Sequence, residues 1–347
     1  MRVNPRYGVG LLLAAASVLW WAVGMAVLQP LTEPAGPWSE VLPGNNTYWA
    51  RDLRFTALIA IVLGLVLAAG GRRVPTRIAA LLGVGWLLAD VAVDRSDLEG
   101  WAYVAPLAIA GCAVLAGAVL LLRRRPGDDV DEVAARRTLL VCACVAAVLA
   151  VFGAGVESPT DREPQLTWAG LTTGVLMLAL TLSCALAAAG SVTGARRWLT
   201  AGLAMAGLAG LTATRLLPPD PRVLPMWATA VLLLTGITLL AWDHPDGRPH
   251  WGRHVLAGVS IAVGLPVLVI ILVTVTNLVP IGPVMTALSG NISISDADSD
   301  VLVSMVGLVA GLVIGVFLAR QIGLGYSADC RHSEPGQPVG KAGQDSL

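Results

Sequence analysis

A single carboxylate, Asp90, lies inside the apolar run Ile78–Val93. A charged side chain in the middle of a membrane-spanning helix costs about 2.5–3.5 kcal/mol on insertion scales, so it is rarely found without a partner or a water-filled cavity. Asp90, Asp94 and Asp97 are spaced i, i+4 and i+7, which predicts that the three carboxylates share one helical face. This face is a candidate proton- or cation-handling path that opens outward.

The alternative use of Asp90 is structural. Arg54 and Arg215 fall near the outer ends of other apolar runs and are candidate ion-pair partners for this carboxylate. Arg54 also ends a polar and aromatic cluster, Asn45–Arg54. A guanidinium there suits bidentate recognition of a carboxylate or phosphate, and arginine and tryptophan at a helix end are also ordinary interfacial anchors. The sequence leaves these uses open.

Pro266 and Asn277 mark the ninth apolar run, Val255–Val279, as a second candidate transport element. Proline lacks an N–H and clashes with the carbonyl of residue i−4, here Ala262, which predicts a kink near mid-membrane. Broken helices at the bilayer midplane are where many secondary transporters bind substrate. Prolines also occur in spanning helices without such a role, so a purely structural proline is the alternative.

A stripe of small residues, Gly307, Gly311 and Gly315, recurs at a spacing of four in the tenth apolar run. Such a stripe lets a second helix approach closely and pack by van der Waals contact. We expect it to pack against another helix of the same chain. A homo-oligomer or a partner membrane subunit that docks on this tenth helix is the alternative.

Metal and cofactor chemistry has few candidate residues. No histidine lies in a predicted span or on the predicted outer side, which argues against haem or copper. The sequence also lacks a Walker-type phosphate loop and a G-x-S-x-G nucleophile motif. We therefore predict no catalytic residue, no cofactor and no metal site, and with a formal net charge of +0 we also predict no nucleic-acid partner.

The elements that must position these residues are apolar runs of membrane-spanning length. Hydrophobic residues make up 56% of the 347 residues and charged residues only 13%, which is too little polar surface for a soluble globule of this size. The predicted fold is an all-α, polytopic membrane bundle of about ten transmembrane helices, each with about 20 residues to cross the hydrocarbon core. The bundle covers residues 1–322, and residues 323–347 are a predicted disordered cytoplasmic tail. The predicted spans are Gly8–Leu28, Leu53–Ala69, Ile78–Val93, Trp101–Leu122, Thr138–Val156, Trp168–Gly190, Trp198–Leu217, Val223–Trp242, Val255–Val279 and Val301–Ala319.

Arginine is concentrated in every second connection between these spans, and the alternate connections carry acids and prolines. By the positive-inside rule the arginine-bearing connections face the cytoplasm, together with both termini. The near absence of lysine, with much alanine, valine, leucine and glycine, indicates a high-GC bacterial genome and hence a bacterial inner membrane. The arginines are Arg2 and Arg6; Arg72, Arg73 and Arg77; Arg123–Arg125 with Arg136 and Arg137; Arg196 and Arg197; Arg248 and Arg253; and Arg320.

These features favour a small-solute transporter or permease, or the membrane subunit of an export assembly. No soluble domain interrupts the spans, so any transport or catalysis must use helix ends and loops. One alternative is an integral membrane enzyme that acts on a lipid-linked substrate from the outer face, with Glu33, Glu40, Asp52 or Asp94 as the base. The other alternative is a noncatalytic membrane scaffold, and no motif identifies an enzyme.

Overall fold

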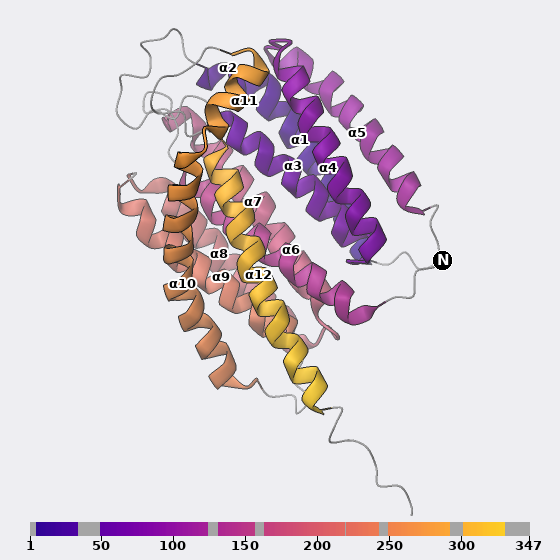
Figure 1. Cartoon of the computed structure of the whole chain (residues 1–347), viewed down its shortest axis with the longest axis vertical. Coiled ribbons are helices and arrows are strands. Elements are labelled where there is room, and N and C mark those ends of the chain that lie inside the picture. The colour runs from indigo at the N-terminus through magenta and orange to yellow at the C-terminus, as the bar shows by residue number, and fades with distance from the viewer. Residues whose placement is uncertain are drawn as a thin grey trace, which may run out of the picture.

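The computed structural model describes residues 5–33, 49–123, 131–156, 163–218, 220–242, 249–291 and 301–329. Throughout these residues the regular elements are helices, arranged as an elongated bundle (Figure 1), so the predicted all-α class is confirmed. The elements are α1 (Pro5–Val23), the π-helical turn η1 (Gly24–Leu28), α2 (Gln29–Thr32), α3 (Trp49–Ala68), α4 (Arg73–Asp94), α5 (Trp101–Arg123), α6 (Glu132–Gly155), α7 (Glu163–Ala188), α8 (Gly194–Leu216), the 3₁₀ turn η2 (Asp220–Arg222), α9 (Val223–Ala241), α10 (Trp251–Leu278), α11 (Ile281–Ser289) and α12 (Leu302–Asp329).

Within the described part of the chain, nine helices are long and apolar enough to cross a membrane. The protein is therefore a multi-pass membrane protein. Each predicted span except Leu53–Ala69 corresponds to one of these nine helices. That span lies in α3, which has 20 residues and carries Arg51, Asp52 and Arg54 in its first two turns. The count of about ten spans and the side of the membrane on which the termini lie stay predictions.

Side chains that the sequence places just before two helices cap their first turns. The carboxylate of Asp131 accepts a hydrogen bond from the backbone N–H of Ala134 at 3.0 Å, at the start of α6. The hydroxyl of Thr193 accepts one from the backbone N–H of Arg196 at 3.3 Å, at the start of α8. Both interactions satisfy N–H groups that have no partner within the helix itself.

Arginines satisfy carbonyl groups at the opposite ends of other helices. Arg136 donates to the carbonyl of Ala188 at the end of α7, at 2.7 Å. Arg196 donates to the carbonyl of Trp242, just after α9, at 2.8 Å. A positive charge at a helix C-terminus also complements the macrodipole. One arginine of each Arg-Arg pair at these two positions is thus used inside the fold.

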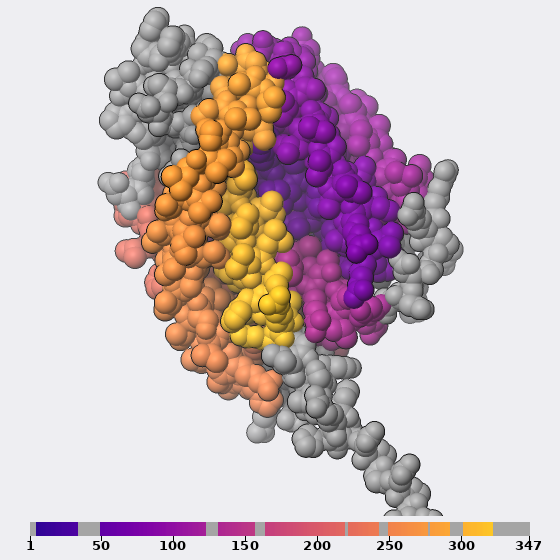
Figure 2. All heavy atoms as spheres, in the orientation of Figure 1, coloured from indigo at the N-terminus to yellow at the C-terminus, as the bar shows by residue number. Residues whose placement is uncertain are grey.

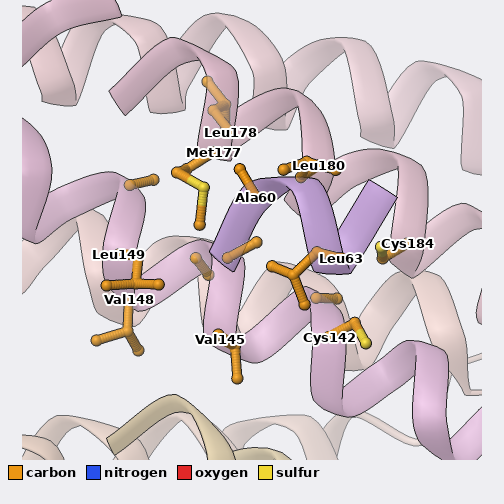
Figure 3. Packing of buried hydrophobic residues seen from close by; sticks show 14 of the residues in the cluster. Ala60, Leu63, Cys142, Val145, Val148, Leu149, Met177, Leu178, Leu180 and Cys184 are labelled. Carbon is orange, nitrogen blue, oxygen red and sulfur yellow. The ribbon is translucent and has the colours of Figure 1, made fainter. Parts of the chain in front are cut away.

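The core of the bundle lies around α3 and α6. α3 contacts α1, α4, α6, α7 and α12, and nearly every residue of α3 is buried. In Figure 3, Ala60 and Leu63 of α3 lie among side chains of α6, such as Val145, and of α7, such as Met177 and Leu180. Other helices surround α3 and α6 on several sides. The apolar residues of α3 and α6 are therefore distributed around the whole helix rather than along one stripe.

Among the interfaces at which small residues bring helix backbones into direct contact are those of α1 with α3 and of α6 with α12. Between α1 and α3, a Cβ added to Gly64 would lie 2.9 Å from the backbone nitrogen of Ala14, and one added to Gly10 would lie 2.6 Å from the carbonyl oxygen of Gly64. Gly10 and Ala14 have the same spacing of four that marks a small-residue packing face. This interface was not predicted, although the spacing is present in the sequence.

The second such interface uses the predicted stripe of α12. A Cβ added to Gly315 would lie 2.8 Å from the Cα of Val141, and one added to Gly311 would overlap the Cα of Val145. Gly307 faces the side chain of Leu149. The stripe therefore packs against α6 of the same chain.

Several helices extend beyond the predicted spans, and two of these differences affect other predictions. α10 begins at Trp251 rather than at Val255, so the prediction that no histidine lies in a spanning helix is wrong: His254 is in the first turn and is buried. The imidazole is accommodated because its Nδ1 lies 2.9 Å from the hydroxyl of Thr238 and its ring lies against that of Trp242. α12 continues to Asp329, and the remainder of the predicted tail, residues 330–347, lies outside the described residues.

Candidate functional site

The start of α3 carries three charged side chains that are buried inside the bundle. Arg51, Asp52 and Arg54 have at most 1% of their surface exposed. Asp90 and Asp94 of α4 lie beside them, and Asp90 is fully buried. We call these five residues the α3 cluster. It lies at the end of the bundle where α2 and α11 are found (Figure 1).

Arg54 joins the two carboxylates of α4. Its Nη2 lies 3.1 Å from Oδ2 of Asp90, and its Nη1 lies 2.9 Å from Oδ1 of Asp94. Nη1 also donates to Oε1 of Gln29 at 3.0 Å. The other oxygen of Asp90 accepts a 2.7 Å hydrogen bond from the indole N–H of Trp21. Each oxygen of Asp90 therefore has a donor, which is the condition under which a buried ion pair offsets its desolvation.

A π-helical turn after α1 makes room for Arg54. The turn begins at Gly24, where an added Cβ would lie 2.7 Å from Cγ of Arg54. The widened backbone also leaves the carbonyl of Ala26 to accept a hydrogen bond from the N–H of Gly100 at 2.8 Å. Turns of this type occur inside α-helices frequently at functional sites. Here the turn lets a long guanidinium side chain pass directly against a helix backbone.

Asp52 caps α12 from a neighbouring helix. Its Oδ1 accepts hydrogen bonds from the backbone N–H of Ser304 at 3.0 Å and from the hydroxyl of Ser304 at 2.7 Å. Its Oδ2 accepts a bond from the backbone N–H of Val303 at 3.3 Å. A carboxylate at this position satisfies unpaired N–H groups of the first turn and interacts favourably with the positive end of the helix dipole.

Arg51 extends the cluster to α11. Its Nη1 donates to the hydroxyl of Thr286 at 3.0 Å, and its Nη2 lies 3.5 Å from Oδ2 of Asp94. The cluster therefore ties α3 to α4, α11 and α12 at one end of the bundle.

Two other charged residues from the sequence prediction lie apart from Asp90. Arg215 donates to the carbonyl of Val156 at 2.8 Å, and its guanidinium lies 5.5 Å from the ring centre of Trp49. The prediction that Asp97 shares a helical face with Asp90 is wrong. α4 ends at Asp94, and Asp97 has a φ of 45° in the turn that follows. Aspartate is one of the few residues that adopt this left-handed conformation readily.

Pro266 lies inside α10, which runs from Trp251 to Leu278 without a break in the helix. The carbonyl of Ala262, which proline deprives of its usual partner, accepts a 2.9 Å hydrogen bond from the indole N–H of Trp227 on α9. A side chain of a neighbouring helix thus satisfies the group that proline leaves unpaired. Asn277 belongs to the last turn of α10, and its side chain lies outside what the structure describes.

Of the acids that could act as a base on an outer substrate, Glu40 lies outside the described residues. Asp52 and Asp94 are engaged in the bonds described above. Glu33 is exposed at the end of α2, where its Oε1 accepts a 3.1 Å hydrogen bond from Nε2 of Gln29. Although the residue is exposed to solvent, neighbouring groups partly desolvate its carboxylate, which raises the pKa of Glu33 above its ordinary value of 4.5, and the negative charges of Asp94 and Asp97 add to this increase.

A large groove, which we call the lateral groove, lies between α3 and α4 on one side and α6 and α12 on the other. Its volume is about 980 Å³. In Figure 2 the hollow is visible on the face of the molecule between α12, in yellow, and α4, in purple. The lining side chains are predominantly apolar: Phe55, Leu58, Ile59, Val62, Leu63 and Val66 of α3; Thr76, Ala80, Gly83, Val84 and Leu87 of α4; Arg137, Thr138, Val141, Cys142 and Val145 of α6; and Ser304, Met305, Leu308, Leu312, Val316, Ala319 and Arg320 of α12.

Polar side chains of the lateral groove are confined to its two ends. Ser304, which binds Asp52 of the α3 cluster, lies at one end. Thr76, Thr138, Arg137 and Arg320 lie at the other end, where α4 and α6 begin. We call these four residues the arginine end. From Ser304 to Arg320 the groove follows 16 residues of α12, which is about 24 Å at a rise of 1.5 Å per residue.

The groove could not be read from the linear sequence. Its lining residues are ordinary apolar side chains on four helices, and only the crossing of those helices leaves a space between them. Trp21 and Gln29 were also missed as partners of the α3 cluster. The sequence signal that points to them is weak. Both residues lie near the end of the first apolar run and Arg54 lies near the start of the second, so consecutive antiparallel helices would place all three at the same end of the bundle.

Comparisons of the chain with protein-family models, with curated proteins and with solved structures give no match. Among the described residues, histidines, cysteines and acids do not gather in a group of three or more that could hold a metal ion. The α3 cluster and the lateral groove are therefore the two features on which a function can be argued.

Proposed function

We propose that this protein is a membrane carrier for an amphiphilic molecule, and that the apolar chain of this molecule occupies the lateral groove. The observation that supports the proposal is the groove itself, with its volume of about 980 Å³ and its apolar lining. Ligand sites in proteins commonly have volumes of roughly 300–1,000 Å³. The volume of the groove therefore falls within the range of ligand-binding sites, and the groove is larger than a packing defect between helices.

The shape of the lateral groove suits a chain that lies along the membrane normal. It follows α12 for about 24 Å, and a hydrocarbon core is roughly 30 Å thick. Exposed apolar residues such as Val84 and Leu312 lie on its walls. A lipid chain can enter such a groove sideways from the bilayer, without leaving an apolar environment.

The same lining argues for an amphiphile rather than a small polar solute. Sites for polar solutes present several convergent polar groups that fix the solute in place. In the lateral groove the polar groups lie at the ends, while the middle is formed by residues such as Val62, Leu308 and Leu312. Pro266 and its helix, α10, do not contribute to this lining.

In this proposal the α3 cluster acts as a rigid frame. Arg54 binds α4 to α3, and Asp52 binds α12 to α3. Three of the four walls of the groove are thereby joined at one end. The pairing of Asp90 with Arg54 and Trp21 gives this buried carboxylate a structural use, so the carrier needs no proton path through it.

The carrier works in a bacterial inner membrane with the arginine end toward the cytoplasm, because arginine-rich connections are retained on that side. The glycine stripe of α12 is occupied by α6, so an oligomer is not needed to cover it. In this proposal the substrate enters the groove from the surrounding bilayer, and one copy of the protein is sufficient to form the complete groove.

The experiment measures how fast a fluorescent lipid moves between the leaflets of vesicles that contain the purified full chain. A reductant that stays outside the vesicles quenches the dye in the outer leaflet, so the rate of fluorescence loss reports the transfer of lipid from the inner leaflet. Leu312→Trp fills the groove, and we expect it to lower the transfer rate at least fivefold. Leu208→Trp is the matched control: both leucines are 41% exposed, and Leu208 lies on α8, away from the groove. Equal rates for wild type and Leu312→Trp, or equal loss in both variants, would contradict the proposal.

A further inference from the structure

The arginine end of the lateral groove differs from the rest of the groove in charge. Arg137 of α6 and Arg320 of α12 are the charged residues among its lining residues, and both are positive and exposed. Among the described residues, neither takes part in an ion pair or a hydrogen bond. Two cationic groups from different helices thus flank the mouth of an apolar groove.

The neighbouring arginine shows that this exposure is specific to position. Arg136 precedes Arg137 directly, yet it donates to the carbonyls of Ala188 and Ala241. Those bonds use Arg136 to hold α6 against the ends of α7 and α9. Arg137 points to the other side of α6 and lines the groove instead.

A hydroxyl group at the same end also has no partner. Oγ1 of Thr76, in the first turn of α4, is buried and has no hydrogen-bond partner among the described residues. A buried hydroxyl without a partner carries a desolvation cost, which a bound acceptor would relieve. Thr76 therefore adds a donor on a third wall of the groove, opposite Arg137 and Arg320.

We infer that the arginine end binds the anionic phosphate headgroup of a membrane phospholipid whose acyl chain lies in the lateral groove. This inference rests on the proposed function. Guanidinium groups bind phosphate oxygens bidentately, and a hydroxyl donor completes the coordination of an oxygen between them. A lone interfacial arginine needs no ligand, because it can extend toward water. Two arginines and an unpaired hydroxyl around one apolar groove match the two parts of a phospholipid.

The dimensions agree with a lipid taken from one leaflet. One leaflet contributes about half of the hydrocarbon core, roughly 15 Å. From Arg320 this length covers about ten residues of α12 at 1.5 Å per residue. The chain of a lipid with its phosphate at Arg320 therefore passes Val316 and Leu312 and ends near Leu308, within the lined part of the groove.

The test is a lipid-binding titration of the delipidated full chain in detergent. Native mass spectrometry counts the lipid molecules bound to each protein as phosphatidylglycerol or phosphatidylcholine is added. The combined variant Arg137→Gln/Arg320→Gln should weaken phosphatidylglycerol binding about 30-fold, since each arginine near an anionic surface contributes about one kcal/mol. Binding of phosphatidylcholine should also weaken, because it carries the same phosphate, but by less than the 30-fold expected for phosphatidylglycerol, since its choline group partly neutralises the phosphate charge. Arg137→Lys/Arg320→Lys, which keeps the charge and loses the planar fork, should fall between wild type and the glutamine variant.

Arg197→Gln is the matched control, because Arg197 is also an exposed second member of an Arg-Arg pair and lies outside the groove. An equal loss for Arg197→Gln would overturn the inference, since binding would then follow overall charge. Displacement of phosphatidylglycerol by inorganic phosphate alone at equal concentration would overturn it too, because the acyl chain would then contribute nothing.

Leu312→Trp separates this inference from the proposed function. If Leu312→Trp abolishes binding of both lipids while the double glutamine variant binds phosphatidylglycerol as wild type does, the headgroup site is refuted and the groove proposal stands. If Leu312→Trp leaves binding of both lipids unchanged, both are refuted. Thermal unfolding midpoints equal to that of wild type would confirm that the glutamine variants are folded, as expected for exposed side chains.

Discussion

Arg54 and Arg137 both belong to helices that line the lateral groove, yet their surroundings are opposite. Arg54 is 1% exposed and is held by two carboxylates and an amide. Arg137 is exposed and has no described partner. At the α3 cluster, four helices converge and each charged side chain has an ion-pair or hydrogen-bond partner within the fold. At the arginine end, the charged side chains are exposed and line the end of the groove.

Arg54 and Arg137 differ because burial restricts the surroundings in which a charge is tolerated. A buried guanidinium must be paired, because an unpaired ion in a low-dielectric interior is strongly unfavourable. An exposed guanidinium at a membrane interface is solvated and remains available to an anion. Arg54 should therefore matter for stability and Arg137 should not, and the following variants test that difference.

Arg54→Met should have the largest effect. It leaves Asp90 and Asp94 buried with fewer donors, and breaking a buried pair from one side costs about 3–5 kcal/mol. We expect a large decrease in the thermal unfolding midpoint of the purified protein in detergent, followed by tryptophan fluorescence. Arg137→Gln, which also removes one positive charge of a groove helix, should leave the midpoint unchanged.

A second substitution tests whether charge balance is the cause. Asp90→Asn in the Arg54→Met background removes the orphaned carboxylate and keeps an acceptor for Trp21, while Arg51 remains beside Asp94. The double variant should therefore be more stable than Arg54→Met alone. A midpoint for Arg54→Met equal to that of wild type, or no recovery in the double variant, would refute the ion-pair account.

Gly24→Ala should have an intermediate effect. The new Cβ would lie 2.7 Å from Cγ of Arg54, whose guanidinium is fixed by its partners and cannot easily move. Overpacking of this kind costs about 1–3 kcal/mol. Gly8→Ala in α1 is the control, since a Cβ there meets nothing within 4 Å. A decrease in the unfolding midpoint for Gly24→Ala alone is expected, and equal midpoints would contradict the close passage of Arg54.

Glu33→Gln should have the smallest effect, and it should depend on pH. Burial raises the pKa of Glu33 above 4.5, so the charged carboxylate is less favourable in the folded than in the unfolded protein. This cost is present above the raised pKa and is relieved as the pH falls through it. Glu33→Gln should be slightly more stable than wild type at pH 7, and the difference should shrink as the pH approaches 4.5. A difference that grows on acidification would contradict the direction of the shift.

Part of the candidate site was accessible from the sequence because its physical cause is local. Asp90 stands out because a carboxylate within an apolar run needs a partner, and Arg54 was one of two candidates for it. The sequence could not show whether Arg54 or Arg215 pairs with Asp90, because the pairing depends on which helices are neighbours. Arg54 reaches Asp90 because Gly24 and the π-helical turn leave space for its side chain.

The sequence by itself determined the helical membrane class, the approximate positions of the long apolar helices and the small-residue face of α12, since apolar length and residue spacing are properties of single segments. Only the tertiary structure decided what lies between the helices. Asp52 caps α12 across 252 positions of sequence to Ser304. The lateral groove exists because α12 packs closely on α6 through its glycines while α4 packs on α3, and the space between the two pairs is left unfilled. Because the groove is formed jointly by four helices from different parts of the sequence, no pattern of residues within one segment predicts it.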